Sequence, residues 1–174
     1  MLLHKAFIGI GSNIGNRLHN LQQAIDRLTL LDGTTVRAIS AIYITEPIGE
    51  IEQSRFYNGV TLLETPLSPE ALRRQCKAIE QELGRPEAYL HWSPRVIDLD
   101  ILLYDDLCLT TKTLTIPHPE LQHRKFVLVP LLDLANPHHP NTKQSIRQML
   151  DSCADRSVLI KTKEKIHIKK ESAC

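Results

Sequence analysis

Long hydrophobic runs are absent from this chain of 174 residues. No apolar stretch approaches the roughly 20 residues that a membrane-spanning helix needs. The first residues also lack the basic leader, the apolar block and the small-residue cleavage site of a secretory signal, and they are more typical of a first strand. The sequence therefore predicts a cytoplasmic protein that contacts no membrane.

Closely spaced cysteines are absent as well. The four cysteines lie far apart, at Cys76, Cys108, Cys153 and Cys174, so no pair has the short spacing of a zinc site. A chain of this length can build a hydrophobic core and needs no disulfide bonds to fold. We expect reduced, unpaired thiols, which agrees with a cytoplasmic location.

Net charge and aromatic residues are both scarce. The formal net charge is +1 and aromatic residues make up 5% of the chain. The charge is uneven, because the residues from Arg156 onward carry six basic and two acidic side chains and the remainder carries 15 basic and 18 acidic ones. This balance, with few rings for stacking bases, predicts no nucleic-acid partner. An anionic substrate must be held by a local cluster of cations.

Glycine-rich phosphate loops are missing too. The segment Gly11–Asn16 lacks the Gly-Lys-Ser/Thr ending of a P-loop and the full dinucleotide fingerprint, so we interpret it as a turn. The pair His138 and His139 has no carboxylate or cysteine nearby in the sequence, which favours a loop over a metal site.

The order of the predicted elements indicates an α+β fold, a sandwich of helices packed on a mainly antiparallel sheet. Apolar residues recur at strand or helix spacing without an internal repeat. We expect strands over Lys5–Gly11, Val36–Thr45, Phe56–Glu64 and Val96–Tyr104, and helices over Leu18–Leu31, Ser68–Gly84 and Thr142–Leu150. The type of the apolar segment Phe126–Ala135 is left open.

We expect a single domain over residues 1–156 and a basic extension over residues 157–174. Ordering a dozen residues costs on the order of 1–2 kcal/mol each in backbone entropy, and this segment has few apolar side chains to offset that cost. The stretch from Lys161 is therefore predicted to be solvated, mobile and dispensable. Ile166 and Ile168 could instead add an edge strand.

The most informative segment is an apolar strand that contains Asp98 and Asp100. Alternate side chains of a strand lie on one face, so the two carboxylates share a face, with Leu99, Ile101 and Leu103 on the other. Two carboxylates in so apolar a strand need a cation, and Mg²⁺ takes one or two carboxylates together with substrate phosphates. The alternative is a solvent-facing pair neutralised by lysines.

Cations lie close to this strand in the sequence. Arg95 favours a phosphate site, since guanidinium groups bind phosphate oxygens in a bidentate manner. Farther along, two prolines flank His118 and restrict the backbone there. With Thr115 and Arg124 nearby, this segment is either a grip for a nucleotide or a stiff connector with solvated cations.

Taken in order, these residues resemble the 6-hydroxymethyl-7,8-dihydropterin pyrophosphokinase family of folate biosynthesis. The matching pieces cover roughly three quarters of the chain and are Gly9-Ile10-Gly11-Ser12-Asn13, Tyr43-x-Thr45-x-Pro47, Phe56-Tyr57-Asn58, the helix end from Glu80 to Arg85, Trp92 to Ile101, Pro117-His118-Pro119 and Arg124 to Leu131. The resemblance implies a ferredoxin-like α+β fold. It also implies a diphosphotransferase that moves diphosphate from Mg–ATP to the pterin hydroxymethyl group and releases AMP.

The resemblance also implies roles for individual residues. Asp98 and Asp100 would hold two Mg²⁺ ions, and Arg85 and Arg95 would act at the phosphates. ATP would contact Glu80, Arg85, Trp92, Arg95, Ile101, Thr115, His118 and Arg124. The pterin would lie between Phe56 and Phe126, with further contacts from Thr45, Pro47, Ile48, Asn58 and Trp92. Arg85 and Trp92 would belong to a mobile loop that closes over the site.

The chain departs from some family members at two positions, where Glu87 and Thr113 stand in place of arginine. Two alternative functions remain at this point. The first is a non-catalytic module that binds nucleotide or pterin, and the second is a different Mg–ATP phosphotransferase. The expected partners are the two small-molecule substrates, and association with other folate-pathway enzymes is a further expectation.

Overall fold

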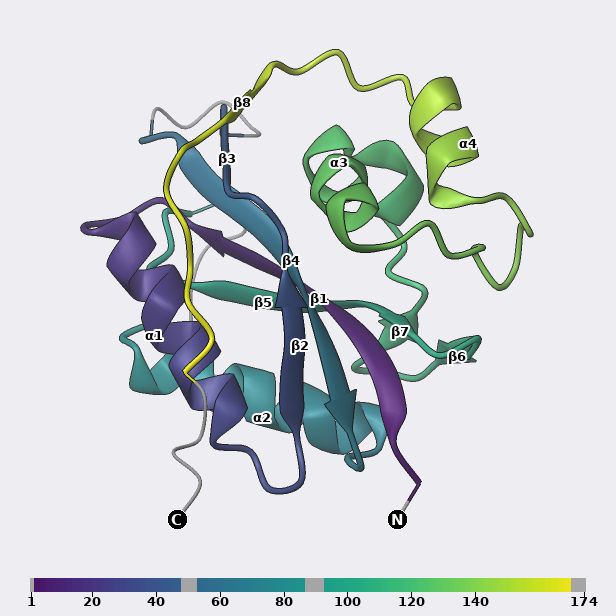
Figure 1. Ribbon diagram of the computed structural model, residues 1–174, viewed down its shortest axis with the longest axis horizontal. Coiled ribbons are helices and arrows are strands. Elements are labelled where there is room, and N and C mark those ends of the chain that lie inside the picture. Colours follow the sequence, from purple (N-terminus) through teal and green to yellow (C-terminus); the bar gives the residue numbers. More distant parts are fainter. Residues whose placement is uncertain (1, 48–52, 87–92, 170–174) are drawn as a thin grey trace.

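A six-stranded sheet forms the centre of the protein, and helices pack on both faces of the sheet (Figure 1). The computed structural model describes residues 2–47, 53–86 and 93–169. The strand order is β5-β1-β4-β3-β8, with β2 also paired to β4, and the pairs are antiparallel. The main elements are β1 (His4–Ser12), α1 (Arg17–Thr29), β2 (Thr35–Ile39), β3 (Tyr43–Thr45), β4 (Phe56–Thr65), α2 (Pro69–Glu82), β5 (Asp98–Tyr104), α3 (Lys125–Leu134), α4 (Ile146–Ser152) and β8 (Leu159–Lys161). A two-stranded ribbon of β6 (Leu109–Thr110) and β7 (Thr115–Ile116) and a short 3₁₀ helix (Leu121–His123) lie between β5 and α3. The predicted α+β sandwich is confirmed.

The two faces of the sheet bury separate hydrophobic clusters. On β1, Ala6, Ile8 and Ile10 belong to the cluster under α1 and α2, whereas Phe7 belongs to the cluster under α3 and α4. Each fully buried aliphatic side chain stabilises the fold by roughly 1.5–3 kcal/mol. On the face of the sheet that α3 and α4 cover, the second half of β1 contributes only Gly9 and Gly11. These residues have no side chain, which leaves space there for a pocket.

The helix starts follow the sequence signals. The Asn16 side chain accepts a hydrogen bond from the His19 N–H at 3.1 Å, and the Ser68 side chain accepts one from the Ala71 N–H at 3.4 Å. The helix that begins after Ser68 stops before Gly84, which has a φ of +104°, a conformation that favours glycine.

Two predicted strand boundaries and the predicted face of one side chain change in the structure. The segment Val36–Thr45 forms two short strands, because Ser40 bends the chain by bonding to Val60 through both its backbone N–H and its hydroxyl, at 2.9 Å each. The strand predicted from Val96 begins at Asp98. The prediction that Leu103 shares a face with Leu99 is wrong, because the ladder with β1 shifts register and moves Leu103 to the other cluster. Phe126–Ala135 corresponds to helix α3.

The described residues of the C-terminal extension pack against the domain, whereas the sequence predicted a solvated segment. Strand β8 pairs with β3, and the chain then runs along α1 (Figure 1). There the Gln22 side chain bonds to both the N–H and the C=O of His167, at 2.9 and 2.8 Å. Ile166 packs against the main hydrophobic cluster. The edge strand forms at Leu159–Lys161 rather than at Ile166 and Ile168.

Candidate active site

A row of residues across three strands forms the base of the candidate site. Gly11 of β1 pairs with Asn58 of β4 on one side and with Asp98 of β5 on the other, and Gly9 pairs with Asp100. A Cβ atom on Gly11 would lie 2.6 Å from Oδ1 of Asn58, closer than such atoms approach. The row therefore requires glycine at position 11 if Asn58 keeps its orientation.

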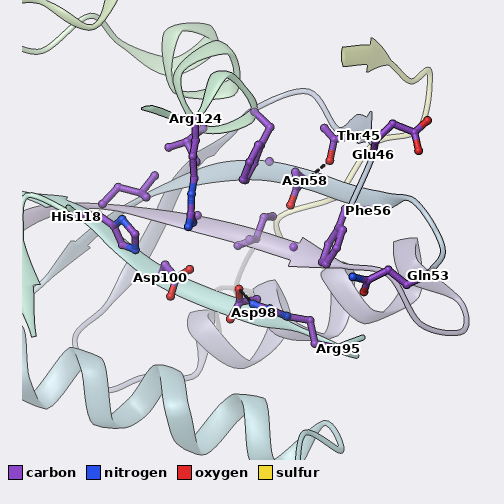
Figure 2. Close-up of a pocket in the computed structure, with 17 residues that line it drawn as sticks. Thr45, Glu46, Gln53, Phe56, Asn58, Arg95, Asp98, Asp100, His118 and Arg124 are labelled. Carbon is purple, nitrogen blue, oxygen red and sulfur yellow. Dashed lines mark hydrogen bonds and ion pairs between the residues drawn. The ribbon is translucent and has the colours of Figure 1, made fainter. Parts of the chain in front are cut away.

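An aromatic pocket lies above this row. Its lining includes Phe56, Asn58 and Phe126, together with Thr45. The Asn58 Nδ2 donates to the Thr45 hydroxyl at 2.7 Å, and both side chains are buried, so this bond fixes the amide. Figure 2 shows Asn58 and Phe56 on the side of the site opposite His118.

Arginines stand beside both rings of the aromatic pocket. The Arg95 guanidinium carbon lies 5.9 Å from the ring centroid of Phe56, and that of Arg124 lies 5.8 Å from the ring centroid of Phe126. These separations place a cation within reach of each ring face. The pocket thus combines flat apolar surfaces with positive charge at its edge.

A second, cationic pocket lies on the other side of Asp100. Lys77 of α2, Ile101 of β5 and Thr115 of β7 line it, as do Arg73 and Lys112. Asp100 and His118 line both pockets. The two pockets therefore meet at these two side chains, so that molecules bound in them would face each other across Asp100.

Asp98 is held by two arginines. Its Oδ1 accepts from Arg85 at 2.5 Å, and its Oδ2 accepts from Arg95 at 2.7 Å. Burial would raise the pKa of Asp98, but the guanidinium groups of Arg95 and Arg85 outweigh burial and lower it. Asp98 is therefore an anion that is already neutralised.

Asp100 has the opposite character. Burial, and then repulsion by Asp98, raises its pKa from 3.8 to about 7. The positive charge of Lys77 and Arg124 opposes this rise without cancelling it. A carboxyl with so high a pKa lacks a compensating charge, and a cation bound beside it would supply one.

His118 closes the junction of the two pockets. Its backbone N–H donates to the Leu102 carbonyl at 2.9 Å, and its ring Nδ1 accepts a bond from the Glu120 backbone N–H at 3.1 Å. Burial, and then the nearby charge of Arg124, lowers the pKa of His118. The ring is therefore neutral at pH 7, with Nδ1 as an acceptor.

Some predicted site residues lie away from the pocket walls. Glu80 is 2% exposed and accepts bonds from the Leu99 N–H at 2.7 Å, from Lys77 and from Arg85. Arg85 is also buried, bonded to Glu80 and Asp98 at the base of the site. Pro47 is half-buried and is not among the residues that line the aromatic pocket. Ile48, Glu87 and Trp92 lie outside the described residues.

Asn13 is a structural residue of the site to which the sequence alone assigned no role there. Its side chain donates to Gln53 and to the Ser54 carbonyl, at 2.8 and 3.1 Å, and accepts the Arg95 N–H at 2.8 Å. It thus joins the segment before β4 to the segment before β5. The signals in the sequence were its place in the turn after the first strand, which is also typical of an ordinary turn, and its place at the end of the Gly9–Asn13 piece that resembles the family.

Two kinds of feature are absent from the described residues. No group of three or more histidine, cysteine, aspartate or glutamate side chains is arranged to hold a metal by itself. No helix is long and apolar enough to cross a membrane. The antiparallel α+β fold carries two pockets that meet at Asp100 and His118.

Comparisons with known proteins identify the family. The family model described as 7,8-dihydro-6-hydroxymethylpterin-pyrophosphokinase (HPPK) matches residues 7–136. The chain is 38% identical over 152 residues to the 2-amino-4-hydroxy-6-hydroxymethyldihydropteridine pyrophosphokinase of Pseudomonas aeruginosa, an alignment that covers 87% of this chain and 93% of that enzyme. The chain therefore belongs to the HPPK family of folate biosynthesis.

Other relatives are much longer. The "Folic acid synthesis protein fol1" of Schizosaccharomyces pombe is 43% identical over 154 residues, which cover 88% of this chain and 21% of that protein. A crystal structure of a Plasmodium falciparum HPPK-DHPS triple mutant superposes with a TM-score of 0.68 at 16% identity, over 86% of this chain and 43% of that one. At this identity the superposition shows the shared fold.

Proposed function

We propose that this chain transfers diphosphate from ATP to the hydroxymethyl group of 6-hydroxymethyl-7,8-dihydropterin and releases AMP, in the folate pathway. Membership of the HPPK family supports the reaction. The structural observation that carries the proposal is the meeting of an aromatic pocket and a cationic pocket at Asp100 and His118. This arrangement suits a flat acceptor on one side and a nucleotide on the other.

The aromatic pocket is proposed to hold the pterin. Phe56 and Phe126 offer ring faces for stacking, and Asn58 offers a donor and an acceptor for the polar edge of the heterocycle. Thr45 keeps the Asn58 amide in place through their 2.7 Å bond. Pro47, Ile48 and Trp92 remain proposed contacts of the pterin.

The cationic pocket is proposed to hold ATP. Ile101 and Thr115 would contact the nucleotide, and Arg73, Lys77 and Lys112 supply positive charge where Thr113 stands in place of an arginine. Glu80 and Arg85 are proposed to act through their ion pairs. Glu80 holds Lys77 in position, and Arg85 holds Asp98 in position.

Two Mg²⁺ ions complete the proposal, held by Asp98 and Asp100. The donors fit this ion, since carboxylates on one strand face, with phosphate oxygens and water as the other ligands, are what Mg²⁺ prefers. The raised pKa of Asp100 also indicates a carboxylate without enough neighbouring positive charge. When bound, Mg²⁺ would neutralise charge on the phosphates.

The reaction forms a bond from the hydroxymethyl oxygen to the β-phosphorus and breaks the bond between that phosphorus and the bridging oxygen to the α-phosphate. The chain's own residues position the two reactants. Phe56, Phe126 and Asn58 would fix the pterin, while Arg95 and Arg124 from the aromatic pocket and His118 from the junction of the pockets would contact the phosphate chain. Such transfers depend chiefly on positioning and on charge stabilisation.

Identification of the nucleotide product tests the proposal. The purified protein, incubated with Mg²⁺, ATP and 6-hydroxymethyl-7,8-dihydropterin, should form AMP and the pterin diphosphate in equal amounts. ADP would instead indicate an ordinary kinase, and no turnover would indicate a binding module. The variant Asp100→Asn serves as the control for contaminating activity.

We further infer that the protein works in the cytoplasm and associates with other enzymes of the pathway, with small molecules rather than nucleic acid or membrane as its ligands. The support for association is that relatives such as the "Folate synthesis bifunctional protein, mitochondrial" of Arabidopsis thaliana and the HPPK-DHPS chains join activities in one protein. Co-purification of tagged protein from its own cells tests this inference.

A further inference from the structure

The C-terminal segment 155–169, here called the strap, begins at one wall of the aromatic pocket. The Asp155 carboxylate accepts the Lys125 N–H at 2.9 Å, and the Lys125 ammonium donates to the Ser157 carbonyl at 3.2 Å. Lys125 is the first residue of α3 and precedes Phe126. Since the Arg124 side chain makes no capping bond to the helix, Asp155 supplies the acceptor at its start.

The strap next pairs with the opposite wall of the pocket. In β8, Leu159 pairs with Thr45 and Lys161 pairs with Tyr43, and the Thr162 N–H donates to the Ile42 carbonyl at 2.9 Å. On its other side β3 pairs with β4, where Thr45 is opposite Phe56. The strap therefore extends the cross-strand row that carries two residues of the pocket.

The far end of the strap is fixed to α1. His167 makes two bonds to the Gln22 side chain, and Lys169 pairs with Asp26 at 2.5 Å. Between these anchors and β8, burial and then the Glu164 carboxylate raise the pKa of Tyr57. Tyr57 lies between Phe56 and Asn58 in β4. Figure 1 shows the strap crossing from α4 to β3 and then following α1.

We propose that the strap positions the pterin pocket by holding β3 and the start of α3 at a fixed separation. This inference rests on the proposed assignment of the aromatic pocket to the pterin. A pocket wall that is ordered before binding lowers the entropic cost of binding. The cationic pocket is built from α2, β5 and β7, so loss of the strap affects the pterin site far more than the ATP site.

A matched pair of variants tests the strap. The Ile160 side chain is 49% exposed, so replacing it removes little packing. Hydrogen-bonded pairs alternate along an antiparallel ladder, so the bond from Thr162 to Ile42 implies that the Ile160 N–H points at the Ile44 carbonyl. Ile160→Pro removes that donor. Ile160→Thr keeps the N–H and the strand preference of a β-branched residue, so it is the control.

Steady-state kinetics with both substrates gives the readout. We expect Ile160→Pro to raise the KM for the pterin about tenfold while the KM for ATP and kcat change by less than about threefold. Ile160→Thr should behave as the wild type. An unchanged pterin KM in the proline variant, or equal rises for both substrates, would overturn the proposal.

Two further measurements keep the outcome clear. Phe126→Ala should raise the pterin KM, and an unchanged KM would contradict the assignment of the aromatic pocket to the pterin. If Phe126→Ala raises the pterin KM and Ile160→Pro does not, only the proposal for the strap is overturned. If Ile160→Pro does not fold, hydrogen exchange of the wild-type protein decides. Pterin binding should slow amide exchange in residues 159–162 but not in α4, and the absence of that protection would contradict the proposal.

Discussion

Asn58 and Asp98 lie on opposite sides of Gly11 in one cross-strand row of the sheet. Neighbouring strands are about 4.8 Å apart, so the two side chains are separated by about two strand spacings. Thr45 fixes Asn58 and two arginines fix Asp98. Under the proposed function, this row sets the separation between the pterin edge and the phosphates.

The first prediction concerns the glycine in that row. Gly11→Ala places a methyl group 2.6 Å from Oδ1 of Asn58, which must rotate and release Thr45. We expect pterin affinity to fall at least about tenfold, in the range of losing one buried hydrogen bond, with ATP affinity unchanged. Calorimetry with each substrate measures both quantities. Wild-type pterin affinity in the variant would show that Asn58 does not read the ligand.

The second prediction concerns turnover. Asp98→Asn and Asp100→Asn should each lower kcat by about a hundredfold or more, because charge-stabilising groups at a transferring phosphate contribute effects of this size. Circular dichroism should show an unchanged fold. The variants should also need more Mg²⁺ for half-maximal activity. Near-normal turnover with unchanged Mg²⁺ dependence in both variants would contradict the assignment of the metal site.

The third prediction concerns stability and pH in the ligand-free protein. Folding raises the pKa of Asp100 from 3.8 to about 7, so the favourable contribution of the protonated group is complete below pH 3.8 and is lost as the pH rises through 7. Asp100→Asn cannot ionise and escapes this loss. Its melting temperature should exceed that of the wild type at pH 8 and match it near pH 4.

For that comparison, thermal unfolding without Mg²⁺ or nucleotide is the measurement, and Asp106→Asn is the matched control because Asp106 is exposed. A stabilisation of about 1 kcal/mol corresponds to about 2–4 °C for a domain of this size. Equal melting temperatures for Asp100→Asn and the wild type at pH 8 would show that ionisation of Asp100 does not destabilise the ligand-free protein.

The fourth prediction concerns Arg85. This side chain is bonded to Asp98 and Glu80 in the ligand-free structure, so it reaches the phosphates only if these bonds change during catalysis. We expect Arg85→Ala to lower kcat about a hundredfold with less than about a threefold change in ATP affinity. Single-turnover kinetics separates the two effects. A variant defective only in ATP affinity would indicate a static binding role.

Features that depend on neighbouring residues could be predicted from the sequence, whereas features that depend on pairing between distant segments could not. The common face of Asp98 and Asp100 follows from the period of a strand, and the helix starts at Asn16 and Ser68 follow from side chains that bond three residues along. The bulge that moves Leu103 depends on register with β1, which no local pattern contains.

The same reasoning explains why the strap was missed. The alternating lysines and isolated apolar residues are typical of a solvated tail, and the edge of β3 that pairs with Leu159 lies more than a hundred residues away in the sequence. Gln22 offers a side-chain donor and acceptor that replace a strand partner for His167. Contacts of this kind depend on where the fold brings distant backbone segments together.

The strap has a consequence for the behaviour of the protein at high concentration. Without β8, the backbone of Tyr43–Thr45 would present unpaired N–H and C=O groups at the end of the sheet, a template for pairing with a second copy. With β8 in place the outermost strand has three residues, and lysines at positions 161, 163 and 165 repel another copy. The strap is therefore expected to limit self-association, and chains that end at Arg156 should form concentration-dependent aggregates.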